Sequence, residues 1–400
     1  MKNADQSIRD IQHFGEEGGV VPVIDVAATS TFLNPTDMDR TFRGEMEGCY
    51  LYSRHSNPTV IAFGKKLAAM EGMEAAVGVA SGMAAISSAI EQLMPTGGHV
   101  VSSRTVYGGT YAFFSNLLPR RGIQTTFVDM TDLKAVESAI TPETKVIYTE
   151  SVSNPLLTVS DLAKLGELAR RHKLKFVVDN TFTPLSIAPV QYGADVVVYS
   201  CTKYISGSSD LIAGAIVGSH EFIAQLIDVN YGVVMLCGPV MDPRVAHELY
   251  MRLDHLPLRM RAHARSAQYF SEKIESEGIR VVYPGLKSHP HHALIRTMIR
   301  PDYGFGGMVV ADCGSGELAV KLATKLQNEK FGLYAVSLGF SRTLMSCPAT
   351  STSSEVPTEE QQKMGLTPGL LRLSIGYSGE DATMTERFLK CYREVVGTKP

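Results

Sequence analysis

The chain has 400 residues, 44% hydrophobic and 20% charged, so it is long enough to form more than one hydrophobic core. Its 38 basic and 41 acidic residues leave a net charge of −3, which excludes the strongly basic surface of a typical nucleic-acid-binding protein. Residues 1–19 contain no apolar signal-peptide core, and no later stretch approaches membrane-spanning length. We therefore expect a cytoplasmic protein with no nucleic-acid partner and no membrane partner.

The first 56 residues contain many turn-forming residues and little helical periodicity, so we expect an extended arm there. From residue 57 onward, short apolar runs alternate with amphipathic stretches. The expected strands are 75–82, 99–103, 123–130, 145–151, 174–180 and 194–200. The expected helices are 58–72, 83–94, 111–122, 132–140 and 160–173. This alternation predicts a mostly parallel sheet with helices on both faces, formed by residues 57–252.

The alternation ends near residue 250. A long helical stretch at 259–278 is followed by strand-like runs at 306–313 and 371–377. This mixture predicts a smaller α+β domain over residues 253–400.

The cysteine and histidine patterns predict neither disulfides nor a metal site. The six cysteines lie far apart without any CxxC pair, which is typical of free thiols in a chain without a signal peptide. The run at 289–292, His-Pro-His-His, matches no standard zinc-ligand spacing, so we expect a polar loop there.

Polar residues follow several of the expected strands, where ligands of parallel sheets bind. The turn at Ser81 and Gly82 leads from a strand into a helix, so its free N–H groups and the helix dipole favour a phosphate. Asp179 ends an apolar strand, where an unpaired carboxylate is costly, and we expect a cationic partner for it. Lys203 follows the next strand, and Tyr107 could supply an aromatic face.

A phosphate site, a buried carboxylate, an aromatic ring and a lysine together predict a pyridoxal phosphate site. The lysine would bond to the cofactor aldehyde, and the carboxylate would keep the pyridine nitrogen protonated so that the ring accepts electrons. Each residue alone has an ordinary structural explanation, for example a helix cap for Asp179 or a core ring for Tyr107. Their joint occurrence in this order is much more specific.

Seven motifs spread over nearly the whole chain resemble those of the Cys/Met-metabolism family of pyridoxal phosphate enzymes. They are YSRHSNPT (52–59), ASGMAAI (80–86), VYGGT (106–110), ESVSNP (150–155), VVDNTF (177–182), SCTKYISG (200–207) and LLRLSIG (370–376). The resemblance implies an aspartate aminotransferase-like fold (fold type I), with a mostly parallel seven-stranded sheet between helices and a smaller α+β C-terminal domain. It also implies pyridoxal 5'-phosphate as the cofactor and a homotetramer of two catalytic dimers.

The same resemblance implies a role for individual residues toward the cofactor. Lys203 corresponds to the lysine that bonds to the cofactor, Asp179 to the partner of the ring nitrogen, and Tyr107 to the residue that stacks on the ring and assists the leaving group. The positions that correspond to phosphate-binding residues are Gly82, Met83, Ser200 and Thr202. Tyr52 and Arg54 correspond to residues that reach the phosphate of the neighbouring subunit, so the arm 1–56 is expected to contribute to that subunit's active site.

On the substrate side, the resemblance assigns the α-carboxylate to Arg372, a bidentate role that suits a guanidinium group. Asn154 and Ser337 correspond to residues near the ring hydroxyl and the substrate carboxylate. Val336 stands where cystathionine γ-lyases have a glutamate that suits a substrate with a distal amino acid. An apolar residue at that position favours a small thioether.

Two stretches, 228–249 and 345–355, resemble the plant-type methionine γ-lyase branch, whereas Gly109 replaces a cysteine found in the bacterial branch. The resemblance therefore implies α,γ-elimination of L-methionine to methanethiol, 2-oxobutanoate and ammonia. The alternatives are a γ-replacement transferase of the O-acetylhomoserine sulfhydrylase or cystathionine γ-synthase kind, and a cystathionine γ-lyase. A non-catalytic binding protein is disfavoured because Lys203, Asp179 and Arg372 are all present.

Overall fold

The computed structural model describes residues 4–10, 20–46 and 48–397 of the chain. A seven-stranded sheet forms the centre of the larger part, in the order β1-β7-β6-β5-β4-β2-β3. Its strands are β1 (Ala75–Val79), β2 (Gly98–Ser103), β3 (Ile123–Val128), β4 (Thr144–Glu150), β5 (Lys175–Asp179), β6 (Val196–Tyr199) and β7 (Gly214–Gly218). Only β7 runs antiparallel to its neighbours in this sheet, so the prediction of a mostly parallel sheet is confirmed.

Helices cover both faces of this sheet, and two hydrophobic cores lie between the helices and the strands. One face is covered by α3 (Pro58–Glu71), α6 (Leu133–Ser138), α7 (Leu162–Arg171) and α10 (Pro243–Leu253). The other face is covered by α4 (Gly82–Leu93), α8 (His220–Leu226) and α9 (Val233–Cys237). Every residue of β6 is buried, as expected for a parallel strand with both faces covered.

The stretch expected as one helix at 111–122 is divided in the structure. The short helix α5 (Gly108–Ala112) continues into a π-helical turn at Phe113–Leu117 and a 3₁₀ turn at Leu118–Arg121. Pro119 in this last turn lacks the N–H group that a regular helix needs, which explains why the α-helix does not extend to residue 122.

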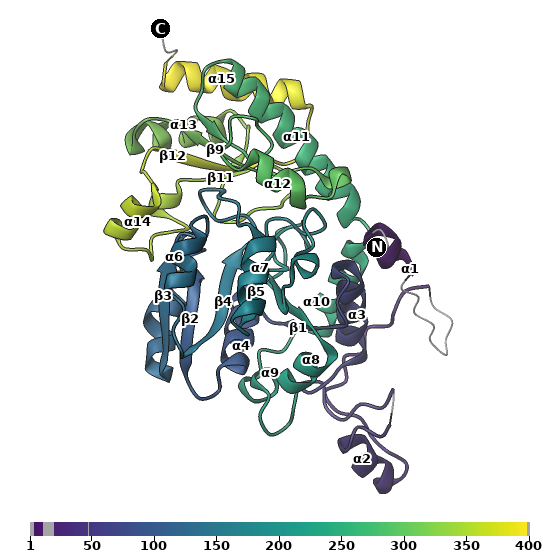
Figure 1. The fold of residues 1–400 in the computed structure, drawn as a ribbon. Helices are drawn as coiled ribbons and strands as arrows, with labels where there is room; N and C mark the ends of the chain where they lie inside the picture. The colour runs from purple at the N-terminus through teal and green to yellow at the C-terminus, as the bar shows by residue number, and fades with distance from the viewer. Residues whose placement is uncertain (1–3, 11–19, 47, 398–400) are drawn as a thin grey trace.

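The smaller part contains a five-stranded sheet in the order β10-β11-β12-β9-β8, in the upper half of Figure 1. Its strands are β8 (Val281–Val282), β9 (Met308–Asp312), β10 (Leu333–Tyr334), β11 (Leu344–Ser346) and β12 (Leu370–Ser374). Its helices are α11 (Leu256–Ser276), α12 (His292–Met298), α13 (Gly316–Asn328), α14 (Thr358–Met364) and α15 (Asp381–Val395). Helices α11, α13 and α15 pack with β9 and β12 in a third core, so the predicted α+β organisation is present.

Two helices occur in the segment that we expected to be an extended arm. Helix α1 (Ala4–Asp10) buries Ala4 and Ile8 in the core beside α3. Helix α2 (Pro35–Phe42) begins at Asn34, whose side chain accepts a hydrogen bond from the backbone of Thr36. An Asn-Pro pair is a helix-start signal, and the composition of the arm concealed it.

The segment that carries α2 projects from the lower end of the molecule (Figure 1). Residues 11–19 of the expected arm lie outside the described residues. Among the described helices, none combines the length and the apolar character needed to cross a membrane.

The backbone of β7 passes very close to the turn between β1 and α4. A Cβ atom on Gly214 would lie 2.0 Å from the carbonyl oxygen of Ser81 and 2.9 Å from the backbone nitrogen of Gly82. Because these are backbone atoms, a side chain at this position could be accommodated only by moving the turn. Gly214 therefore fixes where the N-terminus of α4 lies relative to β7.

We predict that Gly214→Ala lowers the free energy of unfolding by about 1–3 kcal/mol, the usual cost of overpacking a close contact. The control is Gly218→Ala on the same strand, where the nearest atom to the new Cβ is a Phe222 ring carbon at 3.1 Å, and that ring can rotate. Thermal denaturation of both variants checks this. Equal melting temperatures for Gly214→Ala and the unchanged protein would contradict the steric argument.

Candidate active site

A cavity of about 290 Å³ lies at the carboxyl edge of the large sheet, where residues of the smaller part close it. It is lined by most of the site residues predicted from the sequence, which are Gly82, Met83, Tyr107, Asn154, Asp179, Ser200, Thr202, Lys203, Val336 and Arg372. The parallel strands explain this, because their carboxyl ends meet at one edge of the sheet.

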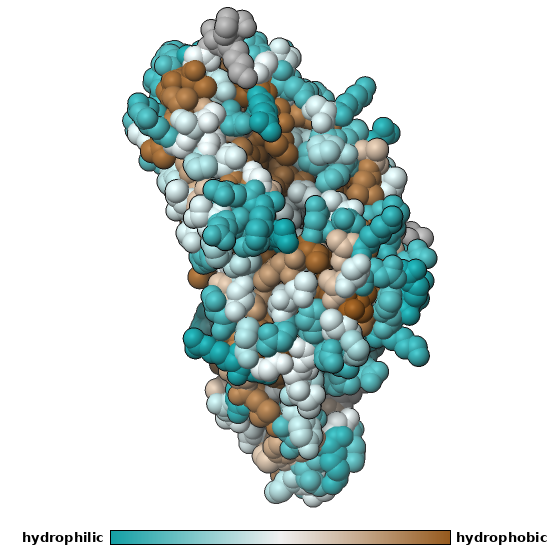
Figure 2. Space-filling model, turned by 60° about the vertical axis from the view of Figure 1, so that its left-hand side comes forward, coloured by the Kyte–Doolittle hydropathy of each residue, from teal (hydrophilic) through white to brown (hydrophobic). Residues whose placement is uncertain are grey.

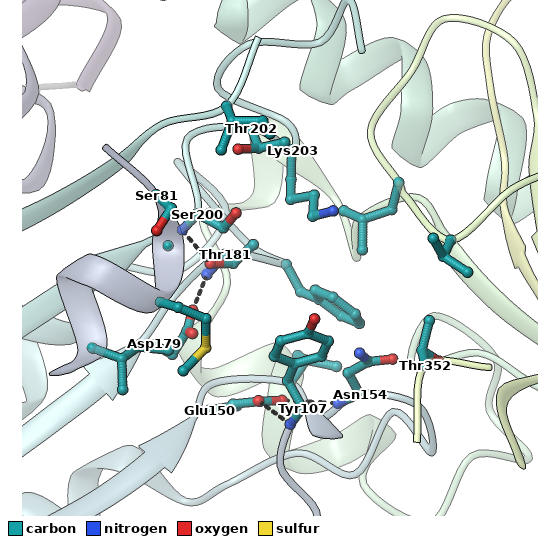
Figure 3. A pocket seen from close by; sticks show the side chains of 18 of the residues that line it. Ser81, Tyr107, Glu150, Asn154, Asp179, Thr181, Ser200, Thr202, Lys203 and Thr352 are labelled. Atoms are coloured by element: carbon teal, nitrogen blue, oxygen red, sulfur yellow. Dashed lines mark hydrogen bonds between the residues drawn. The ribbon is translucent and has the colours of Figure 1, made fainter. Parts of the chain in front are cut away.

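One end of the cavity is suited to an anion. Helix α4 begins there, and Ser81 caps it through a hydrogen bond from the backbone N–H of Ala84 to the Ser81 hydroxyl, at 3.0 Å. A Cβ atom on Gly82 would lie 2.6 Å from the Cβ atom of Ser200, so glycine allows this close approach. Ser200 and Thr202 add hydroxyl groups at the same end (Figure 3). Free N–H groups, the helix dipole and hydroxyl donors together favour a phosphate.

Two carboxyl groups lie together at the ends of adjacent strands. Glu150 on β4 and Asp179 on β5 are paired in register, and both line the cavity. Burial raises the pKa of Asp179, while hydrogen bonds from Thr181 oppose that shift in pKa. Burial and the charge of Asp179 raise the pKa of Glu150 to about 8. In the part of the chain that the structure describes, no lysine or arginine forms an ion pair with Asp179, so its expected cationic partner is not a side chain.

Glu150 lies at the end of an expected strand, where the sequence predicts ligand-binding residues, but no role in the site was assigned to it. Its side chain is only 5% exposed, and its two oxygens accept hydrogen bonds from the backbone N–H groups of Tyr107, at 2.7 Å, and Asn154, at 2.8 Å (Figure 3). Thr181 was also missed, and it joins the two ends of the cavity by bonding to both Asp179 and Ser200. Both residues lie in motifs that are recognisable in the sequence. Their hydrogen bonds, however, involve backbone N–H groups, and a sequence motif does not show which backbone groups lie nearby.

Two basic side chains, Lys203 and Arg372, line the same cavity. The Lys203 amine points into the cavity (Figure 3). It donates a hydrogen bond to the Ser337 hydroxyl, at 3.1 Å. Burial, with a smaller effect from the charge of Arg372, lowers the pKa of Lys203 to about 8. A larger fraction of the Lys203 amine is therefore neutral near neutral pH than for a lysine in water.

Arg372 lies on β12 of the smaller sheet and is only 3% exposed. Its guanidinium donates hydrogen bonds to the Asn154 side-chain oxygen, at 2.9 Å, and to the Ser337 carbonyl oxygen, at 3.4 Å. Burial lowers the pKa of Arg372 to about 10. No carboxylate among the described residues forms an ion pair with it, and a buried cation without a counter-ion is suited to an anionic ligand.

Tyr107 precedes α5, and its hydroxyl also points into the cavity (Figure 3). Burial raises the pKa of Tyr107, and the charge of Glu355 raises it further, while Arg372 acts in the opposite direction. The phenol is therefore protonated near neutral pH and can act as a proton donor.

Four predicted residues lie at or beyond the limits of the cavity, and one of them, Ser337, is not among its lining residues although it contacts Lys203. Val336 lines the mouth of the cavity and is 64% exposed. Tyr52 and Arg54 are not among the lining residues. Arg54 instead donates a hydrogen bond to the carbonyl oxygen of Met235, at 2.9 Å, and its guanidinium lies 5.6 Å from the centre of the Tyr52 ring.

The loop at 289–292 packs against its own chain. The backbone N–H of Val159 donates to a ring nitrogen of His291, at 3.2 Å, and burial lowers the pKa of His289 to about 4. Within residues 4–10, 20–46 and 48–397, no group of three His, Cys, Asp or Glu side chains is arranged to hold a metal ion. The six cysteines are free thiols, as predicted.

The cavity fits pyridoxal phosphate group by group. Its anion-binding end suits the phosphate, Lys203 suits the aldehyde, and the buried Asp179 suits a protonated ring nitrogen. Arg372 remains available for the carboxylate of an amino acid. A doubly covered parallel sheet with this site defines a pyridoxal phosphate-dependent enzyme that acts on an amino acid.

Comparison with known proteins agrees with this class. Residues 7–384 match the family model described as Cys/Met metabolism PLP-dependent enzyme. The chain belongs to this family, and its cofactor is pyridoxal 5'-phosphate. The family and the cofactor predicted from the sequence are thereby confirmed.

Individual relatives are similar over most of their length. The chain is 47% identical to methionine gamma-lyase of Arabidopsis thaliana, over 96% of this chain and 89% of that protein. It is 39% identical to L-methionine gamma-lyase of Fusobacterium nucleatum subsp. polymorphum, over 87% and 88% of the two chains. A solved structure from Campylobacter jejuni, proposed to be an O-acetylhomoserine (thiol)-lyase and carrying a pyridoxyl-lysine phosphate, matches with a TM-score of 0.91 at 28% identity, covering 98% and 100% of the two chains. The predicted aspartate aminotransferase-like fold is confirmed.

Proposed function

We propose that this protein is an L-methionine γ-lyase, which converts L-methionine to methanethiol, 2-oxobutanoate and ammonia. The observation that carries the proposal is the single cavity that joins Lys203, Arg372 and Tyr107, in a chain 47% identical to a methionine gamma-lyase. Apolar side chains on the cavity wall, among them Phe182, Val336 and Leu338, suit the thioether end of methionine better than a charged one.

The cofactor would be held at three points. Gly82, Met83, Ser200 and Thr202 would hold the phosphate, Asp179 would pair with the ring nitrogen, and Tyr107 would stack on the ring, and all six residues line the cavity. When bound, pyridoxal phosphate supplies an electron-accepting ring that makes the substrate Cα and Cβ protons easier to remove. All other steps depend on where the side chains of this protein bind the substrate and hold protons.

The substrate is oriented by its carboxylate. Arg372 binds it through two parallel N–H groups, and the Asn154 side chain together with the Ser337 carbonyl keeps the guanidinium in place. This fixes Cα near the Lys203 amine and directs the thioether toward the apolar wall. Such positioning lowers the entropic cost of the reaction.

Two side chains would move protons. Lys203, with a pKa of about 8, is neutral in a useful fraction of molecules near neutral pH, so it can take protons from Cα and Cβ. Tyr107, with its raised pKa, would donate a proton to the sulfur that leaves Cγ.

A γ-replacement transferase is the second candidate, because the matched Campylobacter jejuni structure is proposed to be an O-acetylhomoserine (thiol)-lyase. The two activities share the site and differ in what happens after the group leaves Cγ. A lyase releases the keto acid, whereas a transferase adds a new thiol to the same carbon.

The test is a steady-state assay of the cofactor-loaded protein on L-methionine, with 2-oxobutanoate and methanethiol quantified together. We predict equal yields of both products, no turnover by Lys203→Ala, and kcat lowered about 10²–10⁴-fold by Tyr107→Phe through loss of the proton donor. The control is Tyr111→Phe, a ring on α5, just after Tyr107, that stacks on Phe127 and should leave kcat nearly unchanged. Formation of homocysteine from O-acetylhomoserine and sulfide without cleavage of methionine would show a transferase instead.

We also propose that Tyr52 and Arg54 complete the active site of the neighbouring subunit, in a homotetramer of two catalytic dimers. Both residues lie outside the cavity of their own subunit. Large apolar side chains are exposed, including Leu33, Tyr231 and Leu236, of which Leu236 follows the Met235 that Arg54 contacts, and Figure 2 shows several apolar patches on one face of the molecule. A second copy of the chain would bury such surface. The cytoplasmic location stays a prediction.

Subunit complementation tests this arrangement. Arg54→Ala and Lys203→Ala each disable every site of their own oligomer, but a mixed dimer contains one site with both residues intact. Random mixing by co-expression makes half of the dimers mixed, so we predict about a quarter of the activity of the unchanged enzyme. Activity no greater than that of the separate variants would show that Arg54 acts within its own subunit or not at all.

A further inference from the structure

Among the residues that the structure describes, no lysine or arginine forms an ion pair with Glu150, yet both of its carboxylate oxygens accept hydrogen bonds. We infer that Glu150 is a positioning residue, whose carboxylate holds the backbones of Tyr107 and Asn154 and through Asn154 fixes Arg372. The inference rests on the roles proposed above for Tyr107 and Arg372.

The hydrogen bond to Glu150 Oε1 positions Tyr107. This residue precedes the first turn of α5, and no side chain caps that helix. The hydrogen bond from its N–H group to Glu150 Oε1, at 2.7 Å, connects the loop after β2 to the end of β4. Loss of the bond would leave a partly buried N–H group without a partner and would free the loop that aims the phenol.

The hydrogen bond to Glu150 Oε2 positions Arg372 through Asn154. The N–H group of Asn154 donates to Glu150 Oε2, at 2.8 Å, and the Asn154 side-chain oxygen accepts from the guanidinium, at 2.9 Å. Arg372 comes from β12 of the smaller sheet, so this chain of contacts runs from one sheet to the other. One carboxylate therefore connects the proton donor and the carboxylate-binding group across three separate segments.

The chemistry of the contacts requires a glutamate. Both partners are N–H donors, so the side chain must offer two acceptor oxygens, whereas a glutamine offers only one and an aspartate is one methylene shorter. The register pairing with Asp179 places a second carboxyl group beside it, which makes a carboxylate here costly for folding. A residue that served only packing would be apolar at such a buried strand end.

The test compares Glu150→Gln and Glu150→Asp with a matched control, Glu71→Gln. Glu71, at the end of α3, is also buried, but it accepts a hydrogen bond from the Tyr199 hydroxyl of β6 and does not line the cavity. Two properties would be measured on cofactor-loaded enzyme: kcat on L-methionine, and the dissociation constant of L-norleucine from changes in cofactor absorbance. Norleucine carries a methylene in place of sulfur, so it reports carboxylate binding without elimination. Cofactor retention and melting temperature are measured in parallel.

We expect Glu150→Gln to lower kcat and to raise the norleucine dissociation constant, each about 10–100-fold, because one hydrogen bond to a charged group is lost. Glu150→Asp should change both in the same direction, and Glu71→Gln should change neither when saturated with cofactor. Values for Glu150→Gln close to those of the unchanged enzyme would overturn the inference. So would a variant that loses only stability or cofactor retention but binds norleucine and turns over normally once loaded.

The Asp variant serves the same purpose if Glu150→Gln does not fold, since it keeps the charge and changes only the reach. Full norleucine affinity and full kcat in Glu150→Asp would contradict a two-point contact. If the unchanged enzyme fails to cleave methionine, the proposed function fails, whereas norleucine binding still tests the link between Glu150 and Arg372.

Discussion

The separation of buried charge in one cavity is the constraint on which the rest of the site depends. Within the described part of the chain, Lys203 and Arg372 form no ion pair with a carboxylate, and Asp179 forms none with a lysine or arginine, although all three line the cavity. Unpaired charges in an apolar interior destabilise the fold. Their presence here therefore indicates a ligand that supplies the opposite charges. A cofactor with a protonated ring nitrogen and a substrate with a carboxylate together supply the missing partners.

Much of this site could be predicted from the sequence, because parallel strands bring their carboxyl ends to one edge. The strand ends at Asp179 and Lys203, together with the turn at Ser81, were recognisable as apolar runs followed by polar residues. The family motifs then supplied Arg372, which no strand pattern could place, since it comes from the smaller sheet on the other side of the cavity.

Other features had no local signal. Strand β7 is short and bounded by Gly214 and Gly218, and its antiparallel direction depends on contacts with β1 and β6 that are distant in sequence. Helix α1 escaped notice because its burial depends on packing against α3. Glu150 accepts hydrogen bonds from two backbone N–H groups, one of them 43 residues away. Nearly every residue type carries such a group, so the sequence does not show which residues are the partners. Tertiary structure decides features of this kind.

Burial and the neighbouring Arg372 guanidinium would make Lys203 the reactive amine that bonds to the cofactor. The most direct measurement mixes cofactor-free protein with pyridoxal phosphate over a pH series, traps the adduct with cyanoborohydride, and locates it by mass spectrometry of peptides. A neutral amine is the reactive form, so we predict labelling of Lys203 at a rate that rises with pH through a pKa of about 8, and a higher midpoint in Arg372→Leu. Labelling of a different lysine, or a midpoint near the usual lysine pKa of 10.5, would contradict the account.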